Sequence, residues 1–283
     1  MVEAVLRATR PIGAFLNPVR RLQLACAAVA LAAWELIPAT GLVYRGVFPS
    51  TVAIGSALAQ LLSMPTFWEN LQVTLTEIVI ALCIGTTLGI VVGVGIGGSR
   101  IVAAAFDPLV NGFASTPKII FLPIFYLAFG IGMGSKIAVG TLAAFIPIVI
   151  SVGTAVLHIN PTFIRVGRSF GLTRLQMLRK IYLPAVVEPV VNGMRIAAGS
   201  AIAVVVISET RFSYAGLGFM VIDAYHRARF AQLYALLVII VALAVAANAL
   251  VVRIRAKQAA RRTTVNGQVT KSPSKATHAA PIP

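Results

Sequence analysis

The chain has very few charged side chains. Only 11% of its 283 residues are Asp, Glu, Lys or Arg, whereas a soluble domain carries about 25%. Acidic residues are the scarcest, with 8 against 24 Lys and Arg, and 58% of all residues are hydrophobic. So little polar surface cannot cover a globular fold in water. The composition therefore excludes a soluble domain and indicates a polytopic membrane protein.

Cysteine and histidine are also rare. Cys26 and Cys83 both lie in apolar runs, which favours packing over a disulfide, a metal site or a redox pair. The three histidines are scattered without the spacing of metal ligands, and no Ser/His/Asp arrangement or nucleotide-binding signature is present. The sequence predicts no cofactor and no catalytic site, so any ATP would be bound by another chain.

One match to the dinucleotide-binding pattern GxGxxG, at 93–98, lies inside an apolar run. Such a site needs a preceding strand, which this context does not offer. Glycines recur here every four residues and share one helix face, which lets a second helix approach closely. We therefore predict tight helix packing along a face made of Gly85, Gly89, Gly93 and Gly97.

Long apolar runs dominate the rest of the chain. Because a transmembrane helix needs about 20 mostly apolar residues, these runs predict an all-α protein with about six membrane spans. Three of the runs are free of charge, and three contain charged residues. The predicted spans are 22–44, 78–99, 101–135, 137–157, 186–208 and 230–252.

The distribution of positive charge orients these spans. With both termini in the cytoplasm, the cytoplasmic segments carry most of the Lys and Arg residues, as the positive-inside rule requires. Topology then accounts for the net charge of +16 without nucleic acid. The chain divides into a cytoplasmic N-terminal segment (1–21), a transmembrane domain (22–252) and a basic tail (253–283). We expect the tail to be disordered, and its charge suits contact with anionic lipid. The first apolar run resembles a secretory signal, but the absence of a clear cleavage site favours a retained span.

Two acidic residues lie near the ends of predicted spans. Glu77 precedes the second span and Glu209 follows the fifth. Ionisable groups at membrane depth are costly and often functional, so both are candidates for a role in a solute path or its gating. The alternative is that each caps a helix or pairs with a neighbour such as Arg211. Lys118 and Arg195 are expected to snorkel to the cytoplasmic headgroups.

The cytoplasmic loop 158–184 contains paired helix start and stop signals. Asn160 and Pro161 can begin a helix, and Gly171 can end it in the left-handed conformation. Thr173 and Gln176 fit a capping box that begins a second helix. Two short amphipathic helices joined by a glycine bend suit either an interfacial pair among lipid headgroups or a docking element for a soluble partner. The cationic side chains of this loop are Arg165, Arg168, Arg174, Arg179 and Lys180.

Part of this loop resembles the EAA signature of the permeases of ATP-binding-cassette (ABC) importers. In that pattern nine residues separate a glycine from an isoleucine, and one further residue precedes Leu-Pro. Gly171, Ile181, Leu183 and Pro184 match it at full spacing, whereas the triplet itself falls on 165–167, which read Arg-Val-Gly. Segments 116–132, 193–195, 208–209 and 215–219 resemble the nitrate, sulfonate and taurine subgroup.

The resemblance implies the fold of a type I ABC importer permease, a transport subunit and not an enzyme. Two permease copies, usually a homodimer, would form the solute path in the bacterial cytoplasmic (inner) membrane. A cytoplasmic ATP-binding subunit would dock on the loop, and an extracytoplasmic solute-binding protein would deliver a small anion or a small heterocycle. Gly171 would supply the bend, and Ile181, Leu183 and Pro184 would anchor the second loop helix to the fifth span.

A secondary transporter driven by an ion gradient is the alternative hypothesis. Glu77 and Glu209 could serve such a protein, although no clear inverted repeat is present. A pore or membrane scaffold is a third hypothesis, and no ring of polar or charged residues supports it.

Overall fold

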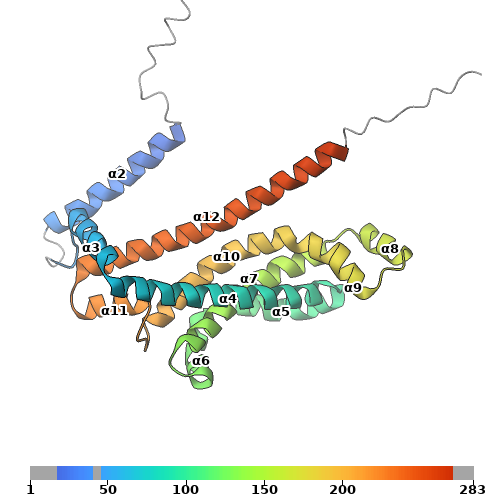
Figure 1. Ribbon diagram of the computed structural model, residues 1–283, viewed down its shortest axis with the longest axis horizontal. Helices are drawn as coiled ribbons and strands as arrows, with labels where there is room; N and C mark the ends of the chain where they lie inside the picture. Colours follow the sequence, from blue (N-terminus) through green and yellow to red (C-terminus); the bar gives the residue numbers. More distant parts are fainter. Residues whose placement is uncertain (1–17, 41–45, 270–283) are drawn as a thin grey trace, which may run out of the picture. The chain divides into compact units, whose positions relative to one another are not determined.

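A computed structural model describes residues 18–40 and 46–269, with the backbone alone described for 18, 38–39 and 254–269. The described residues form helices joined by short connections, and no strand occurs among them (Figure 1). The predicted all-α class is confirmed.

Within the described residues, four helical segments are long and apolar enough to span a membrane. A fifth span is possible, because α5 (Arg100–Ser115) is followed by η2 (Lys118–Phe121) and α6 (Leu122–Phe129) with a bend of 92°. The expected span 101–135 is thus a bent helix pair and not one straight helix. The four long segments are α4 (Pro65–Gly97), α7 (Met133–Leu157), the continuous run Arg174–Glu209 and the first part of α12, Phe230–Arg253.

The first expected span, 22–44, corresponds to α2 (Pro18–Ala39), and its expected end lies outside the described residues. At the other end, α12 (Phe230–Val269) continues past the expected limit of the last span. The expected tail therefore begins within this helix, and 270–283 lie outside the described part, so the disorder expected there stays a prediction. The run RIRAKQAARR favours this continuation of the helix, because Ala, Arg, Lys and Gln all have high helix propensity.

The contacts divide the chain into two units, and each is described by itself. The smaller unit contains α2, α3 (Thr51–Ser63) and residues 223–236. In it the Trp34 ring lies 5.1 Å from that of Phe48 and 5.2 Å from that of Tyr234. Glu35 Oε1 accepts a hydrogen bond from the backbone N–H of Thr51, at 2.7 Å. The acidic residue of the first apolar run thus helps to cap α3.

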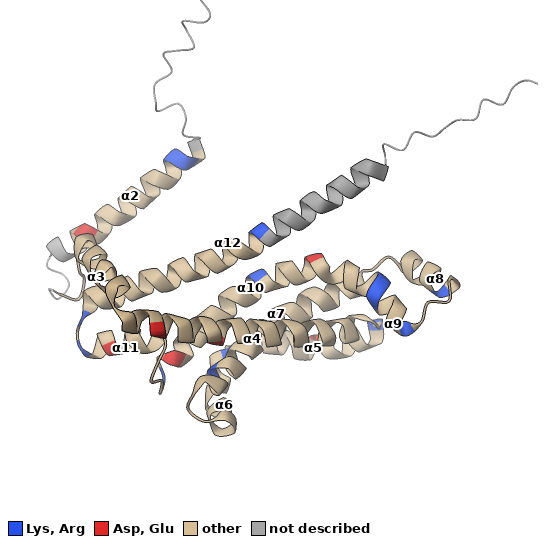
Figure 2. Ribbon diagram, viewed as in Figure 1, with Lys and Arg blue, Asp and Glu red and all other residues tan. Residues whose placement is uncertain are grey.

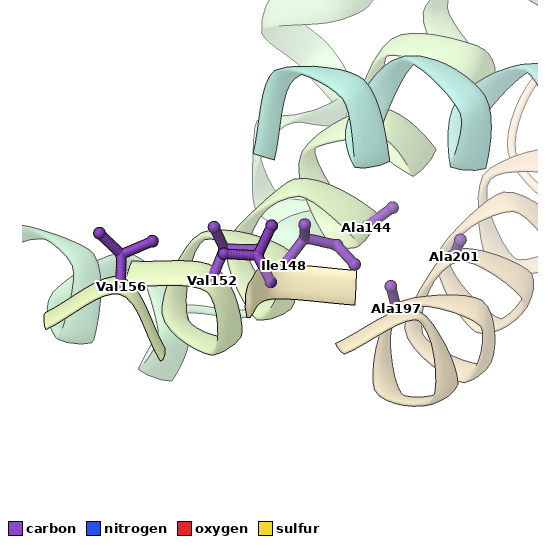
Figure 3. Packing of buried hydrophobic residues seen from close by; sticks show 7 residues of the cluster. Ala144, Ile148, Val152, Val156, Ala197 and Ala201 are labelled. Atoms are coloured by element: carbon purple, nitrogen blue, oxygen red, sulfur yellow. The ribbon is translucent and has the colours of Figure 1, made fainter. Parts of the chain in front are cut away.

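The larger unit is built around α4, α7 and α10 (Leu183–Glu209), which pack against one another (Figure 1). The glycine face of α4 lies against α7. A Cβ added at Gly89 would come within 2.7 Å of the Ile148 Cβ, and one at Gly97 within 2.4 Å of the Gly153 carbonyl oxygen. The side chains of α7 that meet these glycines repeat with the same spacing: Ala144, Ile148, Val152 and Val156. Figure 3 shows these four side chains with Ala197 and Ala201, which α10 adds to the same core.

Candidate functional site

The first candidate site is the loop between α7 and α10. Its first helix, α8 (Pro161–Ser169), begins with an Asn160 side chain that accepts a hydrogen bond from the Thr162 N–H at 2.9 Å. It ends in a left-handed Gly171 with a φ of +67°. The N–H groups of Gly171 and Leu172 donate back to the carbonyls of Arg168 and Gly167, at 2.9 and 3.1 Å. This pair of bonds is a Schellman motif, so the bend has a defined shape.

The second loop helix, α9 (Arg174–Met177), starts with the predicted capping box. The Gln176 N–H donates to Thr173 Oγ1 at 3.3 Å, and the Thr173 N–H donates to Gln176 Oε1 at 2.9 Å. Leu183 and Pro184 do not interrupt the helix that follows. A π turn, η3 (Leu178–Tyr182), connects α9 directly to α10. Pro184 has no N–H to donate to the carbonyl four residues earlier, and the wider turn lies where that bond is missing.

Close packing holds the two loop helices together. Gly167 is buried, and a Cβ at this position would lie 2.6 Å from Met177 Sδ and 2.8 Å from Ile181 Cδ1. Gly167 occupies the last position of the degenerate EAA triplet, where the signature has alanine. A small residue is therefore kept at the contact although the triplet is lost. Sequence reasoning did not assign a role to Gly167.

An apolar groove of about 660 Å³ lies between α8 and the start of α10. Its apolar lining residues include Phe163, Val166, Phe170, Ile181 and Pro184. Phe170 is 80% exposed. An exposed aromatic side chain beside an apolar groove is typical of an interaction surface. Cationic residues lie on α8, α9 and η3 (Figure 2). Lys180 lines the groove, and the side chains of Arg168 and Arg174 are exposed.

The second candidate site is a cluster of buried polar side chains at the other end of the larger unit. Glu77 of α4 and Glu209 of α10, both singled out by the sequence, have no exposed surface. Lys136 of α7 is also buried, and its Nζ lies 3.6 Å from Glu77 Oε1 and donates to Ser213 Oγ at 2.6 Å. Glu77 makes no hydrogen bond to any residue that the structure describes, and the Lys136 ammonium is its ion-pair partner.

Side chains of α4 and α10 cap the helix α11 (Leu217–His226), which follows α10. The N–H groups of Gly216, Leu217 and Gly218 point out of the first turn, where no carbonyl of α11 can accept them. In chain order they donate to Asn70 Oδ1 (2.7 Å), Thr74 Oγ1 (2.8 Å) and Glu209 Oε2 (2.7 Å). Glu209 thus acts as a helix cap, one of the two alternatives left open by the sequence, and its carboxylate also favours the positive end of the helix dipole.

The glycines of the segment 215–219 are explained by this contact. Gly216 has a φ of +108°, and a Cβ there would lie 2.2 Å from Glu209 Oε1. A Cβ at Gly218 would lie 2.2 Å from the Val206 carbonyl oxygen. Gly216 and Gly218 therefore let the backbone pass directly over the carboxylate of Glu209.

Sequence reasoning missed several members of the cluster. Asn70, Thr74 and Glu77 follow a spacing of four and three that puts them on one face of α4, and this signal was available. The predicted spans 101–135 and 137–157 leave Lys136 in the connection between them, which is wrong, because it lies in the first turns of α7 and is buried. Arg195 donates to Asn248 Oδ1 of α12 at 2.8 Å. No group of His, Cys, Asp or Glu among the described residues is arranged to hold a metal ion.

The fold and the two sites define a polytopic membrane protein with a structured loop at one end of its helical core. Residues 85–264 match the family model described as "Binding-protein-dependent transport system inner membrane component". The chain belongs to this family.

Curated relatives and a solved structure agree with the family. The chain is 35% identical over 159 residues to the taurine transport system permease protein TauC of Escherichia coli (strain K12), which is 56% of this chain and 58% of that protein. It is 28% identical over 197 residues to the putative aliphatic sulfonates transport permease protein SsuC of Bacillus subtilis (strain 168), covering 70% and 71%. A chain of the inward-facing MetNI methionine ABC transporter aligns with a TM-score of 0.59 at 25% identity, covering 68% of this chain and 97% of that one.

Proposed function

We propose that this protein is the membrane-spanning permease subunit of an ABC importer for a small anion such as a sulfonate, taurine or nitrate, or for a small heterocycle. Two copies would form the solute path in the bacterial cytoplasmic membrane, with both termini and the loop 158–184 in the cytoplasm. A separate subunit would hydrolyse ATP, and an extracytoplasmic binding protein would deliver the solute. The family and the named relatives support the transport role and the class of solute.

The observation that carries the coupling role is the continuous helical run from the loop to the buried cluster. Arg174–Glu209 contains 36 residues, so the run is about 54 Å long at 1.5 Å per residue. Its first turn is fixed by the capping box, and its last residue is Glu209, which holds α11. A push on the loop by an ATP-binding subunit would therefore travel along one stiff element to the far end of the core.

The apolar groove beside α8 supports docking of a soluble partner in preference to lipid contact alone. The groove is concave and bounded by a bend of fixed geometry, and exposed aromatic side chains such as Phe170 supply area that a partner can bury. A helix pair that only lies in the headgroups needs an apolar face, but it needs neither a cavity nor a Schellman motif.

The alternative of ion-driven transport is less well supported by the geometry. It would require the acidic residues to bind a coupling ion. Both carboxylate oxygens of Glu209 already accept hydrogen bonds, from Thr74 and Gly218, and Glu77 faces the ammonium group of Lys136. Glu209 is thus occupied by protein donors and Glu77 by a counter-ion, which favours a structural role for both carboxylates.

Reconstitution tests the proposal directly. The chain would be assembled in proteoliposomes with its ATP-binding subunit and binding protein, and uptake of labelled taurine, an alkanesulfonate and nitrate would be measured. We expect uptake of at least one of them to require ATP and the binding protein and to survive ionophores. Uptake that persists without ATP and collapses with the ion gradient would overturn the proposal in favour of a secondary transporter.

A further inference from the structure

Helix α5 has two unlike faces and no buried residue. At about 100° per residue, its polar side chains fall within roughly 80° of one another. The opposite side is apolar and includes Phe106, Leu109 and Phe113, each more than 40% exposed. The polar side chains are Arg100, Asp107, Asn111 and Ser115.

Two cavities of different character flank α5. One, of about 410 Å³, is lined by apolar side chains of α4, α5 and α7, among them Val102, Phe106 and Phe145. The other, of about 530 Å³, is lined by Arg100, Asp107 and, from the end of α7, His158, together with apolar residues such as Ala103 and Leu157. A recess of about 90 Å³ continues from Asp107 to Asn111 of α5 and Thr154 of α7. The helix thus separates a groove with an apolar lining from one to which charged side chains contribute, which we call the polar groove.

The polar side of α5 is unsuited to lipid. Asp107 is exposed, and its carboxylate has no ion pair or hydrogen bond to any side chain that the structure describes. An unpaired carboxylate facing hydrocarbon is strongly disfavoured, so at membrane depth such a group faces water or another protein group. The polar groove also lies at the end of the larger unit that carries the loop, since His158 caps the end of α7 three residues before α8 begins.

We propose that the face made of Arg100, Asp107, Asn111 and Ser115 lines a water-filled stretch of the solute path at the loop end of the core. The inference rests on the proposed transport function and names the residues that the solute passes. Water and a small hydrated anion would occupy this stretch of the path. Arg100 attracts the anion to the mouth of the groove, while the Asp107 carboxylate keeps its binding weak, as passage requires.

Thiol accessibility tests this assignment in the assembled complex. In a background with Cys26→Ser and Cys83→Ser, single cysteines would replace Asp107, Asn111 or Ser115 on the polar face and Phe106, Leu109 or Phe113 on the apolar face. Inside-out membrane vesicles would be treated with an anionic or a cationic methanethiosulfonate reagent. Because only water-exposed thiols ionise and react, we expect the polar-face positions to be labelled at least about tenfold faster than the apolar-face positions.

A second measurement probes the charge of the groove. With Asn111→Cys as the reporter, adding Asp107→Asn should raise the ratio of anionic to cationic labelling rates by about threefold or more, because a nearby negative charge is removed. The matched control is Leu109→Cys with the same Asp107→Asn change, whose ratio should not move. An unchanged ratio at Asn111→Cys would contradict a shared aqueous groove.

Two results would overturn the inference. Equal labelling of the two faces would mean that α5 has no water-lined side. Unreactive polar-face cysteines that form disulfides between copies would assign the face to a protein–protein contact instead. The labelling does not depend on ATP-driven uptake, so the two proposals can fail separately. Labelled polar-face positions in a complex that does not import would contradict the importer proposal and would still support the aqueous groove.

Discussion

The carboxylate of Glu209 accepts a hydrogen bond from the N–H of Gly218 at 2.7 Å, and the two residues belong to successive helices. The contact makes α11 begin on a side chain of α10. Thr74 of α4 joins them, because its hydroxyl donates to Glu209 and accepts from the Leu217 N–H. Hydrogen bonds therefore connect three helices at one point.

This relationship predicts a graded response at position 209. Glu209→Ala should destabilise the protein by about 1–3 kcal/mol for each buried donor that loses its acceptor. Glu209→Gln should cost less, since one amide oxygen still accepts one of the two bonds. Thermal unfolding of the purified protein in detergent measures the order. Equal midpoints for the two variants would mean that the hydrogen bonds do not carry the stability.

Glycine at position 216 should be indispensable. Gly216→Ala puts a Cβ into an unfavourable positive φ and against the carboxylate of Glu209, so we expect a lower unfolding midpoint and poor yield. Gly199→Ala is the matched control, because nothing lies within 4 Å of a Cβ there. That control should be neutral or slightly stabilising, by about 0.5–1 kcal/mol. A Gly216→Ala protein as stable as the control would refute the close approach.

The buried pair Glu77 and Lys136 should behave as a unit. Lys136→Met alone leaves a buried carboxylate without its counter-ion and should cost about 3–5 kcal/mol. The double variant Glu77→Gln with Lys136→Met should recover much of this loss, because no charge is left buried. A double-mutant cycle on unfolding free energies gives the coupling, and additive losses would show that the two groups do not interact.

The glycine face of α4 allows a comparison within one helix. Gly89→Ala brings a methyl group against Ile148 and should push α4 away from α7, whereas Gly95→Ala faces open space. Both changes favour the helix equally, so their difference reports packing alone. We expect the first to lower the unfolding midpoint and the second to raise it or leave it unchanged. The reverse order would place the contact on another face.

The loop bend can be tested separately from its surroundings. Nothing lies within 4 Å of a Cβ at Gly171, so any effect of substitution there comes from its φ of +67°. Gly171→Asn should be tolerated, because asparagine adopts the left-handed conformation, and Gly171→Val should not. The readouts are retention of the ATP-binding subunit in a pull-down and ATP-dependent uptake, with membrane insertion unchanged. Normal uptake by Gly171→Val would count against the coupling role of the loop.

The sequence predicted the features that are encoded locally. The Asn160 cap, the Gly171 bend and the capping box of Thr173 and Gln176 each depend on residues a few positions apart, and all three occur in the structure. Apolar runs of sufficient length likewise predicted α4, α7, α10 and α12, since span length is set by the thickness of the bilayer.

Features that depend on the packing of distant helices could not be predicted in this way. Lys136 lies next to Glu77 because of the register in which α7 packs on α4. The glycines of α4 allow the two helices to approach closely, but they do not determine which residues of α7 face them. The Asn70 and Thr74 side chains cap a helix more than 140 residues away. The bend between α5 and α6 was also missed, although Thr116 and Pro117 interrupt the run there. Hydropathy averaged over a window as long as a membrane span does not detect such a short interruption.

The π turn between α9 and α10 determines how the loop is rotated about the helix axis relative to the core. A π turn accommodates one residue more than an α turn, and one residue of helix corresponds to about 100° of rotation. The Gly171 bend therefore points in a direction fixed by a single surplus residue in Leu178–Tyr182. If this turn tightened to an α-helix during a working cycle, the loop would swivel about the helix axis while the core stayed in place. The connection could thus let the loop rotate, in addition to transmitting force along the helix.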